Sequence, residues 1–172
     1  MTNQKRTQIE SLSNQVRIAL KLTTPITYDN LKKSLELMGG TVRLESDSRL
    51  KNKASIQKIA KSFEIVLDAS KPEKHILFLL AHNLGHLFIH MGFGNKAKWN
   101  MECDYVESYI RNKYDEEEFQ SNEFATALLM PKAEFRSCSK NGMSISKIAE
   151  HFGVSDKSAD ARAKLLNLVC SS

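Results

Sequence analysis

The segment from residue 70 to residue 91 limits the fold more than any other part of the chain. Its apolar side chains cover most sides of a helical projection, and such a helix is expected in the middle of a core. Ser70 and Glu73 have the S-x-x-E spacing of a capping box, and Gly92 and Gly94 follow the last apolar residues. The large apolar residues are Ile76, Leu77, Phe78, Leu79, Leu80, Leu84, Leu87, Phe88 and Ile89. Histidines inside such a helix need a chemical explanation.

The rest of the chain predicts an α+β fold that is mostly helical, with a small sheet of about three strands. Alternating residues predict strands around 42–45 and 63–68, whereas 54–60 fits a strand or a helix. We expect one domain over 1–136 and, after a short linker near 137–142, a C-terminal helix-turn-helix-like helical pair over 137–172 packed on it. Further helices are predicted over 4–21, 28–38, 115–129, 144–152 and 155–166.

Composition favours a soluble cytoplasmic protein without membrane contact. The chain has three widely spaced cysteines, Cys103, Cys138 and Cys170. An odd number at such spacing is typical of free thiols in a reducing compartment. Residues 1–17 are polar and lack the apolar region of a signal peptide. The longest apolar run, 76–81, is far shorter than the roughly 18 residues of a membrane span.

His82 and His86 have the spacing of two metal ligands. Four residues apart on a helix, they lie one turn apart on the same face, with Cβ atoms about 6 Å from each other. Two imidazoles so placed can bind one zinc ion, as in the H-E-x-x-H motif, although ordinary hydrogen-bonded core histidines are the alternative. Here Asn83 stands at the glutamate position of the motif. Gly85 is unfavourable inside a helix, so we expect another element to approach closely there.

A zinc site of this kind needs a third protein ligand. His90 lies one turn beyond His86, but an α-helix rotates it roughly 80° from His82, which favours a supporting or capping role. A glutamate from another helix is the better candidate. The acidic run offers Glu116, Glu117 and Glu118.

Two stretches resemble the ImmA/IrrE metallopeptidase family. Residues 79–90, LLAHNLGHLFIH, are similar to its "lAHELGHlllH" helix, and residues 118–131, EFQSNEFATALLMP, resemble its "E-x-Q-A-N-x-F-A-x-x-L-L-M-P" helix. Residues 148–155, IAEHFGVS, and Ala161-Arg162 resemble its usual C-terminal segment. The resemblance covers about residues 5–168.

This resemblance implies a zincin-like fold with a zinc ion bound by His82, His86 and Glu118. His90 and Asn122 are then candidates for supporting these ligands from outside the coordination sphere. It also implies a cytoplasmic protein that recognises, and in active relatives cleaves, a helix-turn-helix transcriptional repressor. Such relatives often belong to prophages or mobile elements, or control a stress response.

Asn83 departs from the family at the catalytic position. The family's glutamate is the general base, and an amide cannot take up a proton near neutral pH. The resemblance therefore implies impaired or absent peptide hydrolysis with the metal ligands intact. The alternatives are a natural pseudo-peptidase that binds without cutting, an engineered inactivating change, and a chain that has lost the metal as well.

A DNA-binding helix-turn-helix regulator is a less favoured alternative. Residues 146–166 resemble that motif, the net charge is +5, and residues 49–61 are basic. However, the second helix carries Asp156 and Asp160 beside its cations, so its face is not strongly basic. Salt-dependent binding to duplex DNA would distinguish this class.

Overall fold

The computed structural model describes residues 1–46, 55–100, 106–107 and 116–170. These ranges do not include Cys103 or the first residue of the helix expected at 115–129. They also leave out Arg49, Lys51 and Lys53 of the basic stretch. The described elements are α1 (Asn3–Ala19), α2 (Tyr28–Leu37), β1 (Thr41–Glu45), β2 (Ser55–Ile59), β3 (Ser62–Asp68), α3 (Glu73–Gly85), the π-helix η2 (His86–His90), α4 (Lys96–Asn100), β4 (Val106–Glu107), α5 (Glu116–Leu129), α6 (Lys132–Lys140), α7 (Ile145–Phe152) and α8 (Asp156–Leu165).

The predicted α+β class, mostly helical with a small sheet, is confirmed. β1 pairs with β3 in parallel, and β2 pairs with β3 in antiparallel. A two-residue strand, β4, extends the sheet, so its order is β1-β3-β2-β4. Phe63, Ile65 and Leu67 of β3 are fully buried, as their alternation predicted. Within the ambiguous segment at 54–60, residues Ser55–Ile59 form the strand β2.

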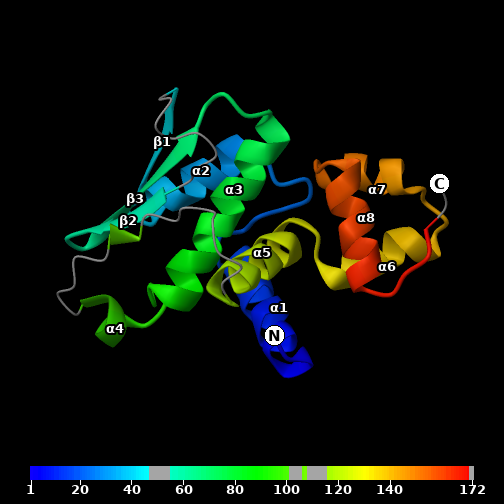
Figure 1. Cartoon of the computed structure of the whole chain (residues 1–172), viewed down its shortest axis with the longest axis horizontal. Coiled ribbons are helices and arrows are strands. Elements are labelled where there is room, and N and C mark those ends of the chain that lie inside the picture. Colours follow the sequence, from blue (N-terminus) through cyan, green and yellow to red (C-terminus); the bar gives the residue numbers. More distant parts are fainter. Residues whose placement is uncertain (47–54, 101–105, 108–115, 171–172) are drawn as a thin grey trace.

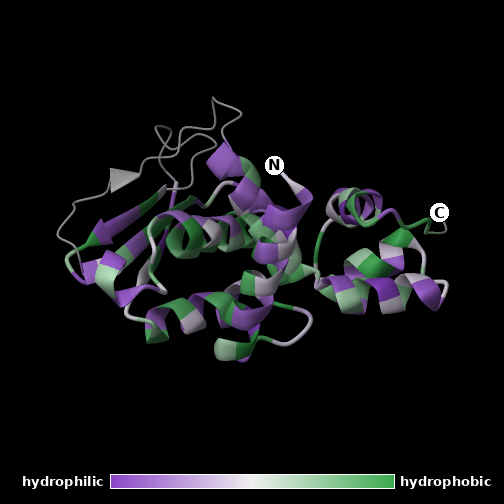
Figure 2. Ribbon diagram, turned by 90° about the horizontal axis from the view of Figure 1, so that it is seen from below, coloured by the Kyte–Doolittle hydropathy of each residue, from purple (hydrophilic) through white to green (hydrophobic). Residues whose placement is uncertain are grey.

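The helix α3 lies at the centre of the molecule (Figure 1). It packs against α5, α2 and β3, and α1 covers α5 from the other side. Much of α3 is buried, whereas α1 buries only Ile9, Ser13 and Val16 and is drawn largely in hydrophilic colours near the N label of Figure 2. The apolar central helix expected from the sequence therefore forms the core against which α5 docks.

The start of α3 differs from the sequence prediction. Pro72 precedes the first helical residue, and no side chain caps the helix. The backbone N–H of Ser70 instead donates to the carboxylate of Asp68 at the end of β3. The predicted capping box of Ser70 and Glu73 is thus wrong, because Ser70 belongs to the turn that leaves the sheet.

The C-terminal helices α6, α7 and α8 group beside the central helices (Figure 1). The sequence analysis did not predict α6, which occupies most of the linker expected near 137–142. The proposed division of the chain at 136/137 falls within this helix. Between α7 and α8, Gly153 adopts a φ of 67° and closes a short turn, and Ser155 caps α8. None of the described helices is long and apolar enough to cross a membrane.

Candidate metal centre

The packing of α3 on α5 brings His82, His86 and Glu118 together. His82 and His86 come from successive turns at the junction of α3 and η2, and Glu118 comes from the first turn of α5. The Nε2 atoms of the two histidines lie 3.0 Å apart. The Glu118 carboxylate lies 3.6 Å from Nε2 of His82 and 3.4 Å from Nε2 of His86. The three residues offer ligand atoms that all lie within 4.8 Å of one another.

Burial makes this group suited to binding a cation. His86 is fully buried, and burial lowers its pKa to about 4, so its ring is neutral at neutral pH. Burial alone would raise the pKa of Glu118, but its contacts with His82 and His86 outweigh this and hold that pKa below its usual value. Glu118 is therefore a carboxylate beside the neutral imidazole of His86.

The donor set fits a metal ion. Oε1 of Glu118 is buried and has no hydrogen-bond partner, which is costly for a charged oxygen unless a cation neutralises it. Two imidazole nitrogens and one carboxylate oxygen are ligands that zinc accepts, and three protein ligands leave a fourth position open. The cluster could therefore bind a metal with His82, His86 and Glu118.

Two polar side chains contact the two histidines from outside this group, and a third contacts one of these two side chains. Nδ1 of His82 lies 3.0 Å from Oδ1 of Asn122. Nδ1 of His86 lies 2.9 Å from Nδ1 of His90. Nε2 of His90 lies 3.3 Å from Oε1 of Gln120. His90 and Asn122 were expected here from the sequence, whereas Gln120 was not.

The position of His90 depends on a change of helix type. From His86 onward the helix is a π-helix, and the N–H of Met91 donates to the carbonyl of His86 at 2.9 Å. The ammonium of Lys98 donates to the carbonyl of His90 at 2.6 Å. The rotation of roughly 80° between His82 and His90 holds for a continuous α-helix. It therefore does not apply to His90, whose ring contacts that of His86.

The side chain of Asn83 is directed along its own helix. It is 1% exposed, and its Nδ2 donates to the carbonyl of Leu79 at 2.8 Å. This bond orients the amide with respect to the preceding turn, and it uses a donor that a carboxylate lacks. The side chain at the family's catalytic position is thus bonded to the helix backbone.

Gly85 allows α3 and α5 to approach closely, as its place inside the helix led us to expect. A Cβ at this position would lie 2.8 Å from Cα of Ser121. Real Cβ atoms do not approach a backbone atom so closely. Glycine at this position therefore sets the helix spacing that places Glu118 beside His82 and His86.

Gly85→Ala is expected to lower the free energy of unfolding by about 1–3 kcal/mol, because α3 and α5 must separate. This loss should appear although alanine favours an isolated helix by about 1 kcal/mol. Gly94→Ala is the control, since a Cβ there would meet only Phe88 at 3.9 Å. Urea unfolding measures both variants. If Gly85→Ala is as stable as Gly94→Ala, the contact with Ser121 does not restrict residue 85.

Comparisons with known proteins agree with this arrangement. Residues 36–164 match the peptidase M78 family model, described as the IrrE N-terminal-like domain. A solved structure described as a Mycobacterium tuberculosis transcriptional regulator is similar, with a TM-score of 0.62 and 18% sequence identity. The similarity covers 92% of this chain but only 46% of that one, so this chain spans about half the length of that regulator. At this identity the likeness shows the fold. No curated protein matches the chain significantly.

Proposed function

Because the chain belongs to the peptidase M78 family, with its IrrE N-terminal-like domain, we propose that it is an ImmA/IrrE-type zinc-binding protein. It recognises a helix-turn-helix transcriptional repressor in the cytoplasm, and its own hydrolysis of that partner is impaired or absent. The observation that carries this proposal is the convergence of His82, His86 and Glu118 beside a buried asparagine at residue 83.

Each residue of the centre has a defined part in this proposal. His82, His86 and Glu118 hold the zinc ion. A zinc ion bound by them would polarise a scissile carbonyl and acidify a water molecule. Asn83 occupies the place from which a glutamate would accept a proton, but its amide cannot do so and is bonded to the carbonyl of Leu79. The chain can thus keep the metal while lacking the base.

Two candidate functions differ in what happens to the partner. An impaired peptidase would still cut the repressor slowly, whereas a pseudo-peptidase would bind it and leave it intact. The bond from Asn83 to Leu79 favours the pseudo-peptidase, because it holds the amide against the helix backbone at the position of the general base. Direct DNA binding is less favoured. Arg162 of α8 is buried and bound to Glu10, and Lys164 is bound to Asp160.

The experiment that tests the metal site is the zinc content of the purified chain beside that of Glu118→Gln. We expect about one zinc ion per chain, because three ligands with a fourth open position suit zinc. Glu118→Gln replaces the carboxylate with a neutral amide of similar shape and should lose most of the metal. Glu116→Gln is the control, since Glu116 is exposed and pairs with Lys5. Equal zinc in all three proteins would exclude Glu118 as a ligand.

A further inference from the structure

Each histidine of the centre can bind a cation through Nε2 only if that nitrogen carries no proton. A neutral imidazole has one N–H, so the partner of Nδ1 decides which nitrogen keeps its lone pair. In both rings the Nε2 atom faces the other ring and the Glu118 carboxylate, and Nδ1 faces away. The groups at Nδ1 therefore determine whether the rings are ready to bind a metal.

Asn122 acts on His82 directly. Its Oδ1 lies 3.0 Å from Nδ1 of His82, and an amide oxygen can only accept a hydrogen bond. When this ring carries a single proton, the proton is therefore on Nδ1, which leaves the lone pair of Nε2 directed at the centre. Asn122 lies one helical turn after Glu118 on α5, so one helix supplies both a ligand and the partner of another ligand.

Gln120 acts on His86 through His90. Oε1 of Gln120 accepts from Nε2 of His90, which makes Nδ1 of the neutral His90 ring an acceptor. That Nδ1 lies 2.9 Å from Nδ1 of His86, which must then donate the proton between them. Nε2 of His86 consequently keeps its lone pair. Gln120 is 4% exposed, so water competes little for its carbonyl oxygen.

We propose that Gln120 is a positioning residue of the metal centre, which holds His86 in its Nδ1–H form through His90, as Asn122 does for His82. This proposal rests on the proposed metal-binding function.

The first test is zinc affinity, measured on the full chain by competition with a chromophoric chelator. Gln120→Met removes the acceptor at similar length and should weaken zinc binding about 10- to 100-fold. Gln120→Glu keeps an acceptor oxygen and should bind as tightly as the unaltered chain. Glu123→Gln is the control on the same helix, because Glu123 pairs with Arg6 and contacts neither histidine. Unchanged affinity of Gln120→Met, or equal weakening of Gln120→Glu, would overturn the proposal.

The second test reads the tautomers from histidine ¹⁵N NMR spectra of the metal-free chain. We expect Nδ1–H forms for His82 and His86 in the unaltered chain, and loss of that form at His86 alone in Gln120→Met. Asn122→Leu should change His82 alone. An Nε2–H form of His86 in the unaltered chain overturns the proposal. If the unaltered chain binds no zinc, the proposed function fails, and these spectra decide on the role of Gln120 by themselves.

Discussion

Glu10→Gln is expected to lower the free energy of unfolding by about 3–5 kcal/mol, which is typical for removing one partner of a buried ion pair. Arg162 of α8 is 1% exposed, and its Nη2 donates to both carboxylate oxygens of Glu10 on α1, at 2.8 and 2.9 Å. Its Nε donates to the carbonyl of Met130 at 3.1 Å. Without the Glu10 carboxylate, the buried guanidinium loses the charged group to which it is hydrogen-bonded.

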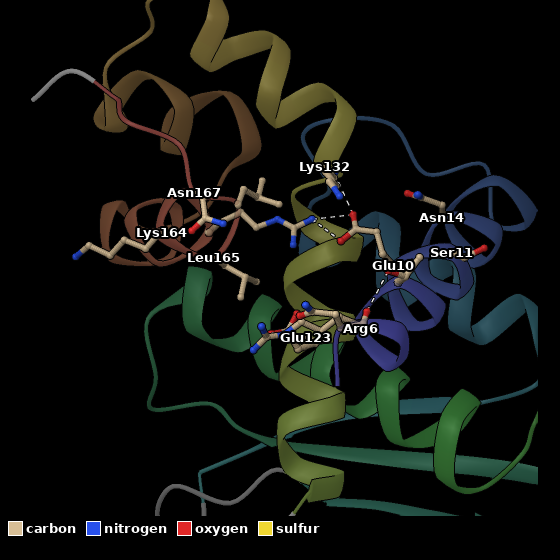
Figure 3. A pocket seen from close by; sticks show the side chains of 13 residues that line it. Arg6, Glu10, Ser11, Asn14, Glu123, Lys132, Lys164, Leu165 and Asn167 are labelled. Carbon is tan, nitrogen blue, oxygen red and sulfur yellow. Dashed lines mark hydrogen bonds and ion pairs between the residues drawn. The ribbon is translucent and has the colours of Figure 1, made fainter. Parts of the chain in front are cut away.

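Glu10 also joins parts of the chain that are distant in sequence. Its Oε1 accepts from the backbone N–H of Lys132, the first residue of α6, at 3.1 Å. Glu10 and Lys132 line a cavity of about 670 Å³, to which α1, α5, α6 and α8 contribute residues. Figure 3 shows their side chains. The Glu10 carboxylate thus connects α1 with the start of α6 and with α8 through hydrogen bonds. Its loss should loosen the C-terminal helices first.

Asp160→Asn is the matched control for this prediction. It breaks another ion pair of α8, between Asp160 and Lys164, but these side chains are 47% and 75% exposed. Exposed pairs contribute at most about 1 kcal/mol. Urea unfolding compares the variants, and the double variant Glu10→Leu/Arg162→Met should recover much of the stability because it leaves no buried charge. A loss for Glu10→Gln no larger than that for Asp160→Asn would contradict the prediction.

The sequence predicted the central helix, most of the other helices and the small sheet because these depend on local periodicity. The apolar residues of α3 required burial, and the alternation of Phe63, Ile65 and Leu67 specified the inward face of β3. The family resemblance, based on the motifs around His82 and Glu118, is confirmed by the match over residues 36–164. Such features can be predicted from the sequence because each depends on a few neighbouring residues.

Features that depend on tertiary contacts could not be predicted in this way. The helix α6 buries only Phe135 and Cys138 among charged and small residues, so few apolar residues mark it as a helix in the sequence. The π-helix at His86–His90 has no local signal in the sequence, and Lys98 from the next helix bonds its last carbonyl. Gln120 contacts His90, thirty residues away in the sequence, only where α5 packs against η2. Its role therefore required the structure.

Asn83→Glu is expected to raise peptide-bond hydrolysis by about 100- to 10,000-fold, the usual contribution of a general base. The amide of Asn83 now donates to the carbonyl of Leu79. An ionised glutamate cannot donate this bond, and repulsion between its oxygens and that carbonyl would turn the longer side chain away from Leu79. The proposed zinc ligands His82, His86 and Glu118 are unchanged, so zinc content should stay the same.

Asn83→Gln is the matched control, because it has the length of glutamate but no basic oxygen. The measurement is cleavage of helix-turn-helix repressors from the same genome, followed on gels and located by mass spectrometry, for all three zinc-loaded proteins. Cleavage by Asn83→Glu alone would support a peptidase site that lacks only its general base. Equal cleavage by the unaltered chain would show that another group supplies the base. If zinc-loaded Asn83→Glu binds a repressor and leaves it intact, the chain differs from active peptidases in more than residue 83, and the binding-module function is favoured.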